Sequence, residues 1–138
     1  MFTDDVISLC RHRISKAGSF LSDAEETLKL GMYENAANRS YYAIFHTIRA
    51  LLALDEKDFS KHSGVISYFQ LTYIKTGILP DRLSKILKSA YSLRTESDYQ
   101  DYFEISDEDV ALQVSEARYF FETVRDYIDQ RIDHEHGQ

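Results

Sequence analysis

Apolar residues recur at steps of three and four along most of the chain, and few residues interrupt this helical period. Pro80 is the only proline, and the chain has 5 glycines. No run alternates between apolar and polar residues as a strand would, and no hairpin dipeptide joins two such runs. Because residues that break helices are this scarce, the sequence predicts an all-α protein, an antiparallel up-and-down helical bundle of four to five helices.

The first two helices have well-marked ends. Thr3 has the position of an N-cap, and Gly31 follows the last periodic residue of the first helix, as a helix-terminating glycine does. The second helix is expected over residues 33–54, before a charged turn at residues 55–58. Its predicted core face consists of Ala37, Tyr41, Ile44, Ile48 and Leu51, with Phe45 and Leu52 beside it.

The rest of the chain is less regular. A third helix is expected from about Ser60 to Gly77, and a fourth opens at Pro80 and weakens beyond Leu93. Residues 95–105 lack a period and are expected to form an ordered loop, whereas Ser106 has the position of a cap for a final helix. We expect residues 1–132 to form one helical domain and residues 133–138 to be a frayed tail.

Composition narrows the classes of function. The formal net charge of −7 argues against non-specific coating of nucleic acid, so any contact with RNA or DNA is expected to be local. No apolar run approaches the roughly 20 residues of a membrane span, and the acidic N-terminus does not resemble an export signal, so we expect a cytoplasmic protein. A lone Cys10, no Glu-x-x-His pair and no glycine-rich phosphate loop lead us to expect neither a metal site nor a cofactor.

One arginine and one histidine stand seven residues apart in the second predicted helix. Arg39 and His46 leave that helix within about 20° of each other and about 10 Å apart along its axis. Asn35 and Tyr42 share their sector, which lies opposite the predicted core face. A permanently charged guanidinium beside an imidazole that titrates near neutrality is suited to handling a phosphodiester.

Other interpretations of this pair remain. The helix phase disfavours a buried, hydrogen-bonded histidine, but it is compatible with an ordinary solvent-facing pair. A ridge of small residues runs beside the pair, where a merely solvated face would more often carry Glu and Lys; its members are Ala36, Ser40, Ala43, Thr47 and Ala50. We expect this ridge to line a groove or a subunit contact.

The segment Ala-Asn-Arg-Ser-Tyr-Tyr-Ala-Ile-Phe-His at residues 37–46 resembles the Arg-x(4–6)-His signature of the HEPN superfamily of nucleotide-binding helical domains. The likeness covers nearly the whole chain, from about residue 4 to residue 132. It extends to residues 61–66, to Arg94 with Asp98 and Tyr99, and to Glu116-Ala117 and Phe120-Phe121. As an ordered set, these motifs resemble the small stand-alone branch of the superfamily.

The resemblance implies a homodimer in which the Arg/His helices of two subunits meet across a cleft. It also implies a metal-independent endoribonuclease of toxin–antitoxin type, with a minimal nucleotidyltransferase as antitoxin. His46 would then act as acid or base near the ribose 2′-hydroxyl, Arg39 would stabilise charge on the phosphate, and Asn35 and Tyr42 could orient phosphate or base. The alternative is a non-catalytic module that binds a nucleotide or docks a nucleotidyltransferase.

Some positions depart from the pattern or stay open. Some toxins of this type carry a tyrosine two residues after the histidine, which the partner modifies with AMP, but Ile48 stands there in this chain. His62 is expected to be an ordinary histidine at a helix start, with a second active-site role as the alternative. Arg94, Asp98 and Tyr99 are expected to fix the chain direction at a helix end, with substrate contact as the alternative.

Overall fold

The computed structural model describes the backbone of residues 1–99 and 105–136. Its elements in chain order are α1 (Asp4–Lys29), α2 (Tyr33–Leu54), α3 (His62–Phe69), the π-helical segment η1 (Gln70–Ile74), α4 (Asp81–Tyr99) and α5 (Asp107–His136). The described residues contain no strand. The predicted all-α fold is therefore confirmed, and α2 has the predicted bounds.

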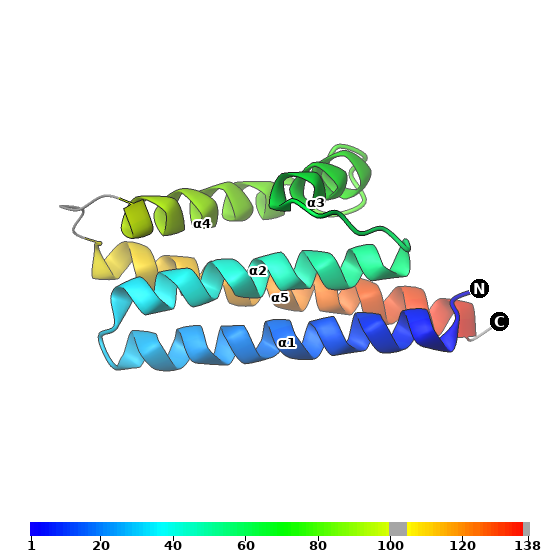
Figure 1. Cartoon of the computed structure of the whole chain (residues 1–138), viewed down its shortest axis with the longest axis horizontal. Coiled ribbons are helices and arrows are strands. Elements are labelled where there is room, and N and C mark those ends of the chain that lie inside the picture. The colour runs from blue at the N-terminus through cyan, green and yellow to red at the C-terminus, as the bar shows by residue number, and fades with distance from the viewer. Residues whose placement is uncertain (100–104, 137–138) are drawn as a thin grey trace.

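The long helices lie along a common axis. Figure 1 shows α1, α2 and α5 side by side, with α4 and the short α3 both lying beyond α2, on the side away from α1. A tight turn joins α1 to α2, so these two helices are antiparallel neighbours. Both termini lie at the same end (Figure 1), where the backbone N–H of Phe2 donates to Glu135 Oε2 at 2.6 Å.

The ends of α1 follow from local capping chemistry. Thr3 Oγ1 accepts a hydrogen bond from the backbone N–H of Val6 at 3.2 Å, as an N-cap does. At the other end Gly31 has φ +75°, and the N–H of Met32 reaches back to the Thr27 carbonyl at 2.9 Å. Both predicted boundaries of the first helix are confirmed.

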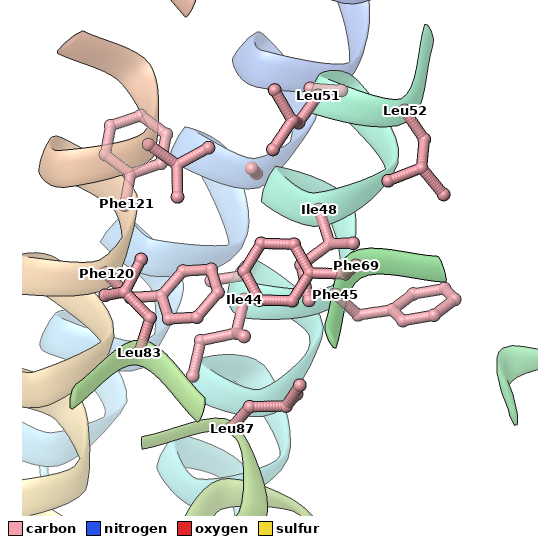
Figure 2. Packing of buried hydrophobic residues seen from close by; sticks show 14 of the residues in the cluster. Ile44, Phe45, Ile48, Leu51, Leu52, Phe69, Leu83, Leu87, Phe120 and Phe121 are labelled. Carbon is pink, nitrogen blue, oxygen red and sulfur yellow. The ribbon is translucent and has the colours of Figure 1, made fainter. Parts of the chain in front are cut away.

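Helix α2 is the central helix of the bundle, because α1, α3, α4 and α5 all contact it. Residues 43–48 are all buried, which is more than one helical turn and so includes every side of the helix. Figure 2 shows Ile44 and Ile48 among aromatic and aliphatic side chains from other helices, including Phe69 and Phe120, whose ring centroids lie 5.7 Å apart. The whole predicted core face of α2 is buried.

The predicted end of the fourth helix is wrong, and the structure adds detail to the third helix and to the C-terminal tail. Helix α4 continues to Tyr99, so the segment expected to be a loop begins as helix; residues 100–104 lie outside the described part. Helix α5 continues to His136, so the first residues of the tail expected to be frayed are helical. The third helix ends at Phe69 and passes into η1, where the N–H of Lys75 bonds to the Gln70 carbonyl at 2.8 Å. The end of α5 lies beside the N-terminus, where the backbone N–H of Phe2 donates to Glu135.

Among the described residues, no helix has both the length and the hydropathy of a membrane span.

Candidate functional site

Phe20 of α1 brings the two predicted residues of α2 together. Its ring stacks on the His46 imidazole, with centroids 5.2 Å apart and planes 10° apart. The guanidinium carbon of Arg39 lies 5.8 Å from the centroid of the same ring, within range of a cation–π contact. A single ring from the neighbouring helix thus contacts both members of the pair.

The two members differ in their exposure. Arg39 is exposed, and its Nη1 donates a hydrogen bond to Asn38 Oδ1 at 3.0 Å. His46 is buried, with 8% of its surface exposed. The prediction that both face away from the core is therefore right for Arg39 and wrong for His46. A helical wheel assumes one buried face, whereas α2 has neighbours on several sides and Phe20 of α1 covers His46.

His46 has an unsatisfied polar atom. Its Nδ1 is buried and has no hydrogen-bond partner among the described residues. Buried polar atoms in folded proteins nearly always have a partner, so such an atom marks a position where water or a ligand can complete the hydrogen bonding. The expected alternative of a buried histidine whose hydrogen bonds are all satisfied does not fit this nitrogen.

The ridge of small residues on α2 is buried inside the bundle and does not lie at the surface as predicted. All five members are completely buried, and α1 packs along α2. The hydroxyls of Ser40 and Thr47 donate to carbonyls of their own helix, at 2.9 and 2.7 Å. Small side chains allow two helix backbones to approach closely, so the ridge serves packing within one chain. The expectation that it lines a groove or a subunit contact is wrong.

Positive charge surrounds His46, although the chain as a whole is acidic. Burial is the main cause that lowers the pKa of His46 to about 4, and the charges of Lys16, Arg49, Arg13 and His62 lower it as well. Lys16 and Arg13 belong to α1, whereas Arg49 belongs to α2. At neutral pH the imidazole is uncharged and can accept a proton, and the surrounding cations favour a bound anion.

The two arginines share one carboxylate. Asp58 forms ion pairs of 3.6 Å with Arg13 and 3.7 Å with Arg49, and Arg13 Nη1 also donates to the Arg49 carbonyl at 3.0 Å. Burial, and then the charge of Arg49, lower the pKa of Arg13. Sequence alone did not assign these cations to the site. The one usable signal was that Arg49 follows His46 by three residues, the spacing of neighbours on a helix surface.

Tyr42 connects the site to α4, while Asn35 lies one helical turn from Arg39 and further from His46. The Tyr42 ring is 6.4 Å from the His46 ring, and its hydroxyl accepts a hydrogen bond from Arg94 Nη2 at 3.2 Å. Asn35 is exposed in the first turn of α2, beside a shallow cavity of about 360 Å³. Eleven residues of helix separate Asn35 from His46, a distance of about 16 Å along the axis.

His62 is a second histidine at this site. Its ring centroid is 4.0 Å from that of Phe45 and 6.5 Å from that of Tyr42, so both α2 aromatics contact it. Burial, and then the charges of Arg94 and Arg49, lower the pKa of His62. The structure therefore places His62 beside the Arg39 and His46 region. Sequence alone could not, because His62 follows α2 across a loop.

Arg94 packs against the same aromatic group. Its guanidinium carbon lies 5.5 Å from the Tyr41 ring centroid and 5.6 Å from that of Tyr42. It therefore holds the Tyr42 hydroxyl in place from α4. The side chains of Asp98 and Tyr99, which were expected to act with Arg94, lie outside the described residues.

The described residues contain no cluster of three or more His, Cys, Asp and Glu side chains that could hold a metal ion.

Comparisons with known proteins identify relatives of this chain. A model of the HEPN domain matches residues 10–127. A UPF0332 protein of Thermotoga maritima is 33% identical over 114 residues, which cover 83% of this chain and 86% of that protein. A UPF0332 protein of Archaeoglobus fulgidus is 36% identical over 102 residues, covering 74% and 80% of the two chains. A protein of Methanocaldococcus jannaschii named as a candidate toxin is 31% identical over 115 residues, covering 83% and 78%.

Proposed function

The chain belongs to the HEPN domain family, and on that premise we propose that it is a metal-independent endoribonuclease of toxin type. Arg39 and His46 are the working pair in this proposal. The observation that carries it is the contact of Phe20 with both residues, which holds a neutral imidazole beside an exposed guanidinium. The name of the Methanocaldococcus relative supports the toxin type.

The proposed reaction uses the ribose 2′-hydroxyl of RNA as nucleophile. His46 accepts the proton of that hydroxyl, and the 2′-oxygen attacks the adjacent phosphorus. The bond from phosphorus to the 5′-oxygen breaks, which leaves a 2′,3′-cyclic phosphate on one product and a 5′-hydroxyl on the other. Arg39 stabilises the negative charge that builds on the phosphate oxygens. The leaving 5′-oxygen takes its proton from a second acid.

We assign that acid to a second copy of the chain, because the Arg39–His46 pair of one subunit supplies one imidazole and His62 packs on Phe45 and Tyr42 instead of on Phe20. Two subunits that approach each other through the exposed Arg39 side of α2 would place two Arg39–His46 pairs at one phosphodiester. Size-exclusion chromatography with light scattering tests this arrangement, because it measures the molar mass of the protein in solution. A dimer is expected, and cleavage by a protein that stays monomeric at assay concentration would exclude it.

The burial of His46 favours a second candidate function, that of a binding module without nuclease activity. An imidazole with 8% of its surface exposed is poorly accessible to a polymer, which fits a module that binds a nucleotide or docks a nucleotidyltransferase without cleaving. The two functions differ in a measurable way, because the binding module would retain RNA intact.

The test compares wild type with His46→Ala and Arg39→Lys, both in cells and with purified protein in EDTA. The matched control is His134→Ala, which removes an exposed histidine from the last turns of α5. Wild type and control should cleave RNA and slow growth, while the two site variants should lose at least about a hundredfold in cleavage rate. If RNA stays intact with the wild-type protein, the enzyme proposal is wrong. If His46→Ala cleaves RNA as fast as wild type, the assignment of the pair is wrong.

A further inference from the structure

A groove of about 730 Å³ lies between the α3–η1 segment and α4. Its apolar surface consists of Ile66, Leu71, Leu87 and Tyr91. Leu71 is 60% exposed and Tyr91 is 49% exposed, so these two side chains face solvent, whereas Leu87 is buried. An exposed aromatic ring in a groove can stack on any nucleobase, because every base has a π-face.

The polar side chains around the groove can pair with a base and its backbone. They include the hydroxyls of Ser63, Ser67 and Ser92 and the amide of Gln70. The basic side chains among the described lining residues are Lys88 and His62. Asp and Glu total 23 in this chain, yet neither occurs among those lining residues. The charge of the groove thus suits a polyanion and does not suit a basic peptide.

Ring contacts through His62 link the groove to the candidate active site. His62 lines the groove and also packs on Phe45 and Tyr42, and Tyr42 contacts His46. On the α4 side, Tyr91 lies 5.9 Å from Tyr41, the neighbour of Tyr42 in α2. A nucleotide chain that has its phosphate at Arg39 and His46 can therefore continue past Tyr42 and His62 into the groove.

We propose that this groove binds a nucleobase of single-stranded RNA next to the phosphate that is cleaved, with the base stacked on Tyr91. Leu71 and Ile66 cover the other edge of the base, and Lys88 contacts the following phosphate. This inference rests on the proposed endoribonuclease function. It names the substrate as unpaired RNA, since a paired base is not free to enter a groove on one side of its strand.

The test measures binding of a short single-stranded 2′-O-methyl oligonucleotide of mixed sequence, which lacks the nucleophilic hydroxyl and stays intact. Its abasic counterpart, with the same backbone, shows what the bases contribute. Tyr91→Ser should weaken binding of the base-containing oligonucleotide about fivefold or more, the low end for loss of one base–aromatic stack. Binding of the abasic oligonucleotide should stay within about twofold, because its phosphate contacts remain.

Leu71→Ser is the second groove variant, and it keeps the test valid if Tyr91→Ser misfolds. Its matched control is Leu112→Ser, since Leu112 is 59% exposed and lines a different cavity, between α4 and α5. Leu71→Ser should weaken binding of the base-containing oligonucleotide, and Leu112→Ser should leave it unchanged.

Two results overturn the groove assignment alone. One is equal affinity of wild type and both groove variants for the base-containing oligonucleotide. The other is a change in oligomeric state on Leu71→Ser without a change in affinity, which would make the groove a subunit contact. Either result leaves cleavage by Arg39 and His46 intact. If wild type binds neither oligonucleotide and cleaves no RNA, the groove assignment and the proposed function both fail.

Discussion

The Phe20 ring of α1 and the His46 imidazole of α2 lie nearly parallel, 5.2 Å apart between centroids. This contact excludes water from one face of the imidazole, and burial is the main cause of its low pKa. The same ring lies under the Arg39 guanidinium. Phe20 therefore influences both the protonation of the histidine and the position of the arginine.

Phe20→Ala should raise the pKa of His46 from about 4 toward its ordinary value of 6.5, because it opens the imidazole to water. The NMR titration of the His46 ring protons measures this directly. The variant should also lose about 2–3 kcal/mol of stability, since Phe20 is half-buried. Phe20→Leu, which keeps most of the apolar cover, should shift the pKa less. An unchanged pKa in Phe20→Ala would show that the stack does not control the proton.

Acid should destabilise the protein through His46. Unfolded His46 titrates near 6.5 and folded His46 at about 4, so between these values the unfolded chain binds a proton that the folded chain does not. This part of the stability is complete well above pH 6.5 and falls by about 3 kcal/mol as the pH drops to about 4.

His46→Phe removes the titration and keeps an aromatic ring against Phe20. Urea unfolding at several pH values should show a flatter dependence for His46→Phe than for wild type. His134→Gln is the control, and it should follow wild type. Equal slopes for His46→Phe and wild type would contradict the assigned pKa.

Asp55 joins three elements at one end of the bundle. It follows α2 and accepts hydrogen bonds from the Tyr73 hydroxyl and from Tyr68 at 3.3 Å. Arg131 of α5 donates to Asp55 Oδ1 at 3.1 Å and to the Tyr73 oxygen at 2.8 Å. Burial, followed by the bond to Asp55, raises the pKa of Tyr73, so this hydroxyl keeps its proton. The network also links η1 to α5.

Asp55→Ala should cost about 2–4 kcal/mol in urea unfolding, because it leaves a half-buried arginine and two hydroxyls without their acceptor. Asp129→Ala removes the partner of Arg11 in an exposed ion pair and should cost less than about 1 kcal/mol. Similar losses in the two variants would mean that the Asp55 network contributes no more than a surface pair.

Ala43 tests the role of the small-residue ridge. It is completely buried in α2, so Ala43→Leu should destabilise the folded chain by about 1–3 kcal/mol or more through overpacking. Ala111→Leu, at an exposed position of α5, should change stability by about 0.5 kcal/mol or less. If the Ala43→Leu protein is stable but has an altered oligomeric state, the ridge takes part in a subunit interface instead.

Much of the secondary structure was predictable because its causes are local. Thr3 caps α1 through its own hydroxyl, and Gly31 ends it with a positive φ that few other residues adopt. Two segments that differ from the prediction lie beside distant partners. Helix α5 reaches His136 beside the N-terminus, and the π-helical η1 carries Tyr73 to Asp55.

The candidate site divides in the same way. Helical periodicity alone puts Arg39 and His46 on one side of α2, because the spacing of seven residues is a property of the helix. That His46 is buried, that Phe20 lies against it, and that Lys16, Arg13 and His62 add their charges are consequences of packing. A sequence states which side chains share a face, but burial and electrostatic field depend on which elements pack against that face, and only the tertiary structure specifies those.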